Sequence, residues 1–128
     1  MSDKFTVEII TPNQTILKTE TSEVIIPSYE GRMGILKEHI PLITFLRPGI
    51  ISIQDLEKKY YVEEGTIEFS NNNLLILTST AKDINDLNQG SIQDLLNIAD
   101  SKVSDNNSSD KEKYISSHKI STLKEISQ

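Results

Sequence analysis

The sequence predicts a mainly β protein with an α-helical appendage: an N-terminal antiparallel β-sandwich over residues 1–86, followed by a C-terminal two-helix hairpin over residues 87–128. Short apolar or alternating stretches recur roughly every 8 to 12 residues as far as Thr80, with turn residues between them. After Lys82 the apolar residues change to the period of an amphipathic helix. A chain of 128 residues with 36% hydrophobic content suffices for one such domain and its appendage, and is too short for two ordinary domains.

The first strands are predicted by apolar residues at alternate positions. Phe5, Val7 and Ile9 alternate with other residues, which indicates a strand with one buried face, and the Thr11-Pro12-Asn13 triplet ends it. Residues 16–26 are rich in β-forming residues and predict one long, bent strand. Pro27 is expected to cap that strand.

The next stretch contains closely spaced turn signals. Gly31 and Gly34 lie three residues apart where polar residues give way to apolar ones, which predicts turns or a bulge with positive φ. Pro41 favours extended backbone in the residues before it and excludes a helix through this segment.

Pro48 and Gly49 have the residue order of a type II turn, which would join a strand over 42–47 to a strand over 50–54. Beyond it we expect a charged turn, two short strands around a Glu64-Gly65 turn, an asparagine turn and a buried closing strand. These elements are expected at residues 55–59, 60–62, 66–69, 71–73 and 74–80. The pattern by itself fits a sandwich or a barrel and does not fix the topology.

Two helices are predicted after the strands. The first carries apolar residues at helical spacing, with Ser91 as its N-cap and Asp94 at the third helical position. A polar linker over 104–109 precedes a second helix, in which Ser109 and Glu112 have the spacing of a capping box. The apolar residues of this second helix spread over more than half of its circumference, so we expect it to dock weakly compared with the first. They are Tyr114, Ile115, Ile120, Leu123 and Ile126.

Composition excludes several functions. The chain has no cysteine, so it has neither a disulfide framework nor a thiolate metal site. Its net charge of −6 argues against nucleic-acid binding, which requires clustered Lys and Arg. The apolar runs are too short to span a membrane, and the N-terminus has no export leader.

Catalytic and ligand-binding alternatives are weak. A hydrolytic site would pair His39 with Glu38 or Glu30, but no serine or threonine has a nucleophile-elbow context. A metal site would need several converging ligands, and the other histidine, His118, lies in the second predicted helix. The glycine pair is followed by Ile35 and Leu36 rather than by the helix of a phosphate-binding loop, so we interpret it as backbone turns.

The segment from Gly31 to Gly49, GRMGILKEHIPLITFLRPG, closely resembles the signature of the epsilon subunit of F-type ATP synthases. The resemblance continues through VEEGTIE at residues 62–68 and through residues 73–81, and it covers about residues 4–86. Agreement at many positions in order makes the match specific, whereas two glycines alone would carry little weight.

The resemblance implies a noncatalytic rotor subunit without cofactors. Such a subunit lies in the central stalk and links the gamma subunit to the c ring during proton- or sodium-driven ATP synthesis. Its hairpin reaches the catalytic alpha and beta subunits and restrains ATP hydrolysis. It is peripheral to the cytoplasmic face of the bacterial inner membrane, which it contacts only through the complex. The family's ring-facing positions correspond here to Thr11, Arg32 and His39.

Four departures from the family pattern alter these expectations. Arg32 stands where relatives often have an acidic residue, and Lys37-Glu38 replaces a common Pro-Gly. The tail has no arginine, so we expect a weak electrostatic grip on acidic partners. Residues 84–89, INDLNQ, lack the arginine of the I-D-x-x-R-A motif of ATP-binding relatives, so we expect no tight ATP site. The alternatives are an unrelated β-sandwich binding module with a helical docking tail and, third, a small hydrolase.

Overall fold

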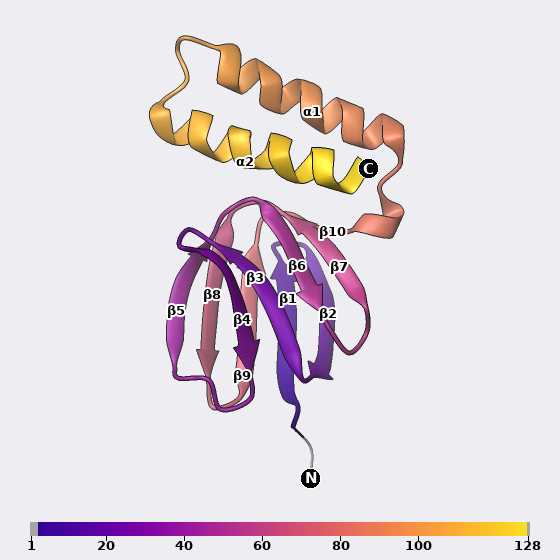
Figure 1. Ribbon diagram of the computed structural model, residues 1–128, viewed down its shortest axis with the longest axis vertical. Helices are drawn as coiled ribbons and strands as arrows, with labels where there is room; N and C mark the ends of the chain where they lie inside the picture. The colour runs from indigo at the N-terminus through magenta and orange to yellow at the C-terminus, as the bar shows by residue number, and fades with distance from the viewer. Residues whose placement is uncertain (1–2, 128) are drawn as a thin grey trace.

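The computed structural model describes residues 3–127 and contains ten strands, one 3-10 turn and two helices in that range (Figure 1). The first five strands are β1 (Phe5–Thr11), β2 (Gln14–Thr21), β3 (Glu23–Ser28), β4 (Gly31–Leu36) and β5 (Leu42–Leu46). The next five are β6 (Gly49–Ile53), β7 (Lys58–Val62), β8 (Gly65–Ser70), β9 (Asn73–Thr78) and β10 (Ala81–Asp83). The chain continues through η1 (Ile84–Asp86), α1 (Gln89–Ser104) and α2 (Asp110–Ser127).

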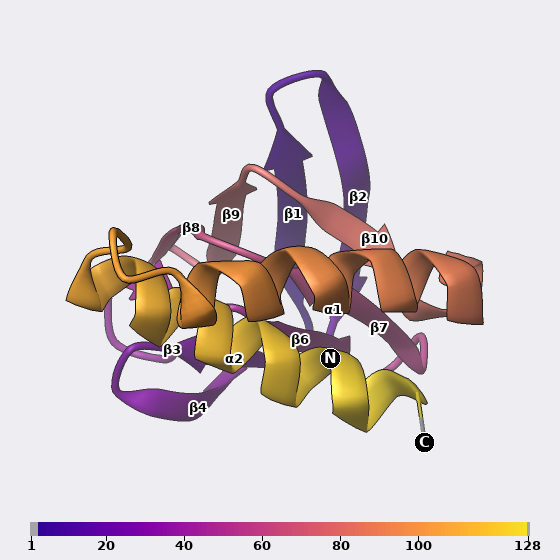
Figure 2. The same cartoon turned by 90° about the horizontal axis from the view of Figure 1, so that it is seen from above.

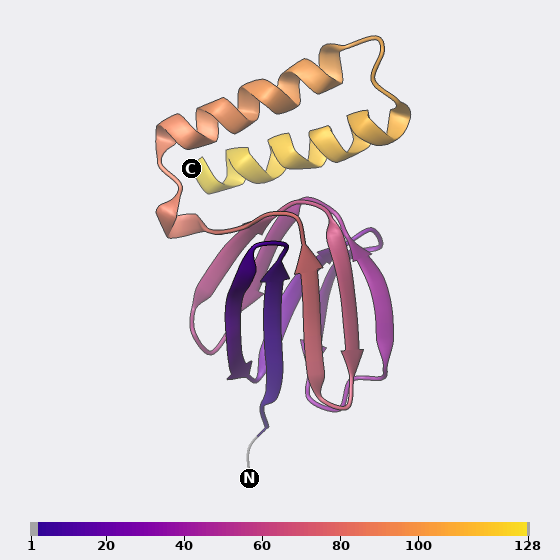
Figure 3. The same ribbon diagram turned by 180° about the vertical axis from the view of Figure 1, so that it is seen from behind.

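The strands form two layers, so the predicted β-sandwich with a two-helix appendage is confirmed. One layer has the order β5-β8-β9-β1-β2, and the other contains β10-β7-β6-β3 with β4 also paired to β3. The layers are continuous only where Ser28 of β3 pairs with Leu46 of β5. All pairs are antiparallel except β1 with β9. The helices cross one end of the sandwich, opposite the end at which β1 begins (Figures 1 and 3).

The core lies between the layers and consists of alternate residues of nearly every strand. Phe5 of β1 and Phe69 of β8 pack edge to face, with ring centroids 5.5 Å apart. The main core cluster consists of buried residues from strands alone: Phe5, Val7, Ile9, Val24, Ile26, Ile35, Leu46, Ile51, Ile53, Tyr60, Val62, Ile67, Phe69, Leu74 and Ile76. Burial of this apolar surface is the main stabilising contribution to the sandwich.

The single long strand predicted over 16–26 is wrong, because the chain changes layer at Ser22. β2 pairs with β1 in one layer, whereas β3 pairs with β4 and β6 in the other. The Ser22 amide donates to Asp55 Oδ2 at 3.0 Å, and its hydroxyl donates to Oδ1 of the same carboxylate. These hydrogen bonds hold the pKa of Asp55 below its usual range. Pro27 does not cap the strand as predicted; it lies inside β3, where its carbonyl accepts from the Arg47 amide at 3.0 Å.

The predicted turns are partly confirmed. Gly31 has φ +118°, as expected, but Gly34 has no positive φ and lies within β4. Pro41 precedes β5 in non-helical backbone, also as expected. The asparagine turn is confirmed, with φ of 50° at Asn71 and 59° at Asn72.

The type II turn predicted at Pro48-Gly49 is wrong, since Gly49 has no positive φ and begins β6 opposite Val62. The strands on either side are not partners in a hairpin. Glycine is needed there because a Cβ would lie 2.5 Å from Pro27 Cβ. Gly65 likewise belongs to a strand rather than to a turn, and a Cβ there would lie 2.2 Å from the Leu77 carbonyl oxygen. Both glycines permit close approach of backbones.

The helical hairpin is confirmed, with two corrections. Asn88 is the N-cap of α1 and its side chain accepts from the Ser91 amide at 2.8 Å, so Ser91 is not the cap. The capping box of α2 is present: the Glu112 amide donates to Ser109 Oγ at 3.1 Å, and the Ser109 amide donates to Glu112 Oε1 at 3.2 Å.

The second helix was expected to dock weakly compared with the first, but the structure places the second helix against the sandwich (Figure 1). α2 is the helix next to the strands and α1 is the outer one (Figures 1 and 2). Leu123 of α2 and Ile92 of α1 are buried with Tyr61 of β7 in a second core cluster. The buried face of α2 also includes Ser116 and Thr122. These small polar residues complete a helical stripe that a count of apolar residues misses.

Candidate partner-binding surfaces

The outward face of the layer that contains β5, β8 and β9 is unusually apolar. Ile43 is 78% exposed, Phe45 60% and Leu77 43%. Cross-strand pairing places Phe45 opposite Thr66, and Thr66 opposite Leu77, in one row. Leu77 in turn pairs with Ile10 of β1. We call this set, Ile10, Ile43, Phe45, Thr66 and Leu77, the apolar face.

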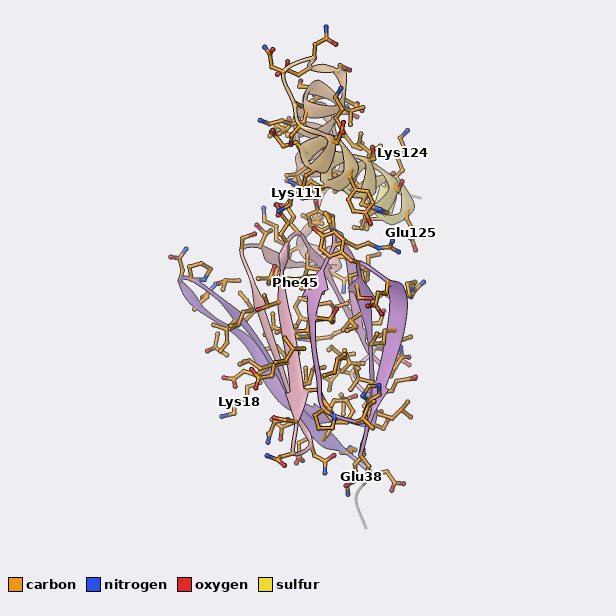
Figure 4. The ribbon with its side chains drawn as sticks, turned by 90° about the vertical axis from the view of Figure 1, so that its left-hand side faces the viewer. Lys18, Glu38, Phe45, Lys111, Lys124 and Glu125 are labelled. Carbon is orange, nitrogen blue, oxygen red and sulfur yellow. The ribbon has the colours of Figure 1, made fainter. Side chains whose placement is uncertain are left out.

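Acidic residues and hollows border the apolar face. Ile43 pairs with Glu68, and Glu68 pairs with Leu75, which in turn pairs with Glu8, so two carboxylates lie in the second row. Two hollows of about 410 and 530 Å³ occur at the helical end of the face. Phe45 lies near this end below Lys111 of α2, which lines the larger hollow with it (Figure 4). The face therefore offers apolar contacts with a polar border, as protein interfaces do.

Sequence reasoning missed the apolar face, although a signal was present. The run LLIL at residues 74–77 was expected to be buried, yet only Leu74 and Ile76 point inward. In β5 the sequence LITFL is likewise apolar at nearly every position. A strand of an antiparallel sheet with one solvated face should alternate, so a continuous apolar run indicates either burial on both faces or a partner.

The structure does not bring Thr11, Arg32 and His39 together. Thr11 lies at the end of β1 and lines the smaller hollow beside Leu77. Arg32 lies at the beginning of β4 and lines a cavity against α2. His39 follows Glu38, which lies at the opposite end of the sandwich (Figure 4). A single flat surface at one end of the molecule cannot touch all three residues.

The loop around His39 is tied to the neighbouring asparagine turn. Glu38, with φ 67°, donates its amide to Asn72 Oδ1 at 2.8 Å and accepts from Asn72 Nδ2 at 2.9 Å. The His39 ring packs edge to face on Phe69, with centroids 5.9 Å apart, and its Nδ1 lies 2.8 Å from the Ile40 carbonyl oxygen. These contacts hold the imidazole against the sandwich.

Polar and aromatic contacts attach α2 to the sandwich. The Tyr61 hydroxyl donates to Glu63 Oε2 at 2.9 Å, and Lys119 of α2 approaches the same oxygen at 3.7 Å. Burial raises the pKa of Tyr61, so its hydroxyl keeps its proton and remains a donor. Tyr114 of α2 stacks on Tyr29 with centroids 5.8 Å apart. The docked helix is thus held by specific contacts as well as by the second core cluster.

Among residues 3–127, no three His, Asp or Glu side chains converge in a way that could hold a metal ion. Neither of the helices there is long and apolar enough to cross a membrane.

Comparison with known proteins gives a family match. The family described as "ATP synthase, Delta/Epsilon chain, beta-sandwich domain" matches residues 4–84. The ATP synthase epsilon chain of Pelagibacter ubique (strain HTCC1062) is 43% identical over 129 residues, covering 98% of this chain and 99% of that protein. The epsilon chain of Rhizobium rhizogenes (strain K84 / ATCC BAA-868) is 28% identical over 108 residues, covering 82% and 80%.

Solved structures show the same fold. A chain of the Euglena gracilis mitochondrial ATP synthase complex of OSCP, F1 and c ring has a TM-score of 0.76 at 17% identity, covering 99% of this chain and 81% of that chain. A chain of the Tetrahymena thermophila mitochondrial ATP synthase central stalk and c ring has a TM-score of 0.62 at 14% identity, covering 95% and 92%. The alternative of an unrelated β-sandwich module is wrong: the chain belongs to the epsilon subunits of ATP synthase.

Proposed function

We propose that this epsilon subunit is a noncatalytic part of the central stalk that links the gamma subunit to the c ring. The observation that carries the proposal is the apolar face, which is an exposed apolar surface on paired strands. Monomeric proteins rarely expose such a contiguous surface unless a partner covers it. The two solved structures of similar fold come from complexes that contain a c ring, which supports the same assignment.

The gamma subunit is the proposed occupant of the apolar face. Phe45 and Ile43 would be its central apolar anchors, because large, exposed side chains near the centre of an interface carry most of the binding energy. Glu8 and Glu68 favour basic residues opposite them on gamma. Thr11 lies at the end of the apolar face and would extend the same contact.

The c ring would meet one end of the sandwich. Arg32 and His39 lie at opposite ends, so only one of them can face the ring while the other faces gamma or solvent. Cysteine cross-linking from each position to the polar loop of a c subunit would decide between the two ends. The subunit would then be attached to the membrane-bound complex at its cytoplasmic face without itself entering the bilayer.

The hairpin over residues 87–128 is the proposed regulatory part. α2 would leave the sandwich and extend toward the catalytic alpha and beta subunits, restraining ATP hydrolysis. The ion pair of Lys119 with Glu63 and the stacking of Tyr114 on Tyr29 oppose that movement. The tail contains no arginine, which favours a weak restraint.

Copurification tests the proposal. A tagged subunit should bring down gamma and the catalytic subunits, and Phe45→Asp should weaken that association at least about tenfold because it buries an unpaired charge. Ile98→Asp is the matched control: Ile98 is similarly exposed, but it lies on the outer helix. If the two substitutions had equal effects, or if the Phe45→Asp variant retained gamma, the apolar face would not be part of the interface with gamma.

A further inference from the structure

A cavity of about 190 Å³ lies between the outer face of the β4-β3-β6-β7 layer and α2, away from the apolar face. Its floor comes from Pro27, Gly49, Ile50 and Ser52, and its roof comes from α2 through His118, Ser121, Thr122 and Glu125. Arg32, Arg47 and Lys59 lie around it. Two strands (β4 and β7), the loop between β5 and β6, and α2 thus place four basic side chains around one small space.

These cations have few partners within the protein. The ion pairs among residues 3–127 involve Lys4, Lys102 and Lys119, so neither arginine is within 4.0 Å of a carboxylate there, and nor is Lys59. Glu125 is the one carboxylate that lines the cavity, and it forms none of these pairs. Arg47 is only half-exposed, yet its guanidinium has five donors. In a chain with net charge −6, the cavity lining thus carries more positive than negative charge, since Glu125 is the one acidic residue among its basic residues.

The electrostatic effect is visible at His118. Partial burial and the positive charge of Arg47 hold the pKa of this imidazole below its ordinary value. Its ring also packs against Tyr114, with centroids 4.5 Å apart. The groups that face it are therefore Arg47 and the other cavity residues Arg32, Lys59 and Glu125, so positive charge predominates around a group that would itself become positive.

We infer that this cavity binds a phosphate group. Two guanidinium groups can donate pairs of hydrogen bonds to oxyanions, a geometry that phosphate accepts well. The cavity has room for a few groups of the size of water, which suits a tetrahedral anion. Ser52, Ser121 and Thr122 add hydroxyl groups. The lining contains no Phe, Tyr or Trp, so the site recognises the phosphate and not a nucleotide base.

Binding should favour docked α2, because the walls of the site come from both the sandwich and the helix. A ligand that binds only one arrangement stabilises that arrangement by mass action. This consequence concerns the position of the hairpin and does not depend on which partner covers the apolar face.

The first test is an NMR titration of the full chain with inorganic phosphate at constant ionic strength. We expect saturable shifts with a Kd on the order of 1 mM, typical of a small anion in an open site. Bound phosphate should raise the pKa of His118, since an anion favours the imidazolium. The chain has only two histidines, and His39 at the other end of the sandwich is an internal control whose resonances should not respond.

Matched variants test the residues. Arg47→Gln should weaken phosphate binding about tenfold, and Lys59→Gln about threefold, because each removes a charge-assisted donor. Lys58→Gln removes the same charge from the neighbouring exposed position of β7, outside the cavity, and should leave the affinity unchanged. If Lys58→Gln and Lys59→Gln weakened binding equally, the effect would be a general one of net charge, and the proposed site would be wrong. The proposal would also be wrong if the shifts did not saturate, or if His39 responded as strongly as His118.

Two further ligands test whether the site recognises the phosphate group alone or a whole nucleotide. Tripolyphosphate and ATP should bind with similar affinity, because the cavity offers nothing to the adenosine. Similar affinities would support recognition of the phosphate group alone. If ATP bound more than tenfold tighter than tripolyphosphate, the site would be a nucleotide site and the inference would be wrong.

Discussion

At the scale of single residues, the turn of the β3–β4 hairpin depends on Ser28 and Gly31. Ser28 Oγ donates to the Gly31 carbonyl oxygen at 2.7 Å and accepts from the Glu30 amide at 3.2 Å, which fixes the hairpin turn. The turn then requires the positive φ of Gly31. Gly34, three residues later, has ordinary strand backbone.

Alanine substitution should distinguish the two glycines. Gly31→Ala should reduce the free energy of unfolding by about 1–3 kcal/mol, because φ +118° is strained for any residue with a Cβ. Gly34→Ala should have a smaller effect, since its Cβ meets only the movable Glu23 carboxylate, 3.2 Å away. Urea unfolding of both variants gives the comparison. Equal losses would mean that φ is not the cause.

His118 predicts a pH dependence of helix docking. Its pKa is lowered in the docked state, so undocked α2 takes up a proton first as the pH falls through about 6.5. Docking should therefore weaken below this pH and level off once docked His118 is protonated as well. Hydrogen exchange of the α2 amides in phosphate-free buffer, between about pH 8 and 5, measures this pH dependence of docking. His118→Gln should abolish the dependence, whereas His39→Gln should preserve it.

At the scale of elements, α2 depends on a mixed stripe rather than on apolar residues alone. Ile115 and Leu123 are buried beside Ser116 and Thr122, and the Thr122 hydroxyl donates to the His118 carbonyl oxygen at 2.8 Å. A hydroxyl bonded to its own helix can be buried at little cost. The buried face of α2 is therefore larger than its apolar residues alone indicate.

Leu123→Ala should release the hairpin without unfolding the sandwich. Leu123 is fully buried against Tyr61 and Ile92. The cavity that the substitution leaves at this position should therefore reduce the free energy of docking by about 2–5 kcal/mol. Amide exchange should accelerate in α1 and α2 and stay unchanged in β1, β8 and β9. Ile98→Ala, on the exposed side of α1, is the control and should change neither region. Acceleration throughout the strands would show instead that hairpin and sandwich unfold as one unit.

At the scale of the whole molecule, the main core cluster contains only strand residues, while the helices share the second cluster with Tyr61. Removing the tail at residue 104 would take away α2 and leave α1 without the surface it packs on. A lone helix of that length is marginal in water. Removal of both helices is the cleaner experiment.

Deletion of residues 88–128 should leave a sandwich that folds, binds gamma and supports ATP synthesis, because no strand and no apolar-face residue is lost. ATP hydrolysis by the reconstituted complex should rise a few fold at most, equivalent to about 1 kcal/mol or less of differential binding. Measured synthesis and hydrolysis rates check both parts. Loss of coupled synthesis would show that the hairpin is structural, and a hundredfold rise in hydrolysis would show a strong brake.

Local chemistry made several elements predictable from the sequence. Alternation defined β1, the asparagine turn required positive φ, and the Ser109–Glu112 spacing defined the start of α2. The motif from Gly31 to Gly49 and its continuation indicated the family. These features depend on residues close in sequence or on a long ordered pattern, so no tertiary information was needed.

Other features depend on which segments meet, and only the tertiary structure decided them. Gly49 and Gly65 look like turn glycines, but they are needed because Pro27 and the Leu77 carbonyl approach from other strands. The apolar face arises because pairing aligns Phe45, Leu77 and Ile10 from three separate strands. The basic cavity forms in the same way, from Arg32, Arg47, Lys59 and His118. A sequence determines local periodicity and backbone preference, whereas side chains far apart in the chain converge only through the register and layering of the sheet.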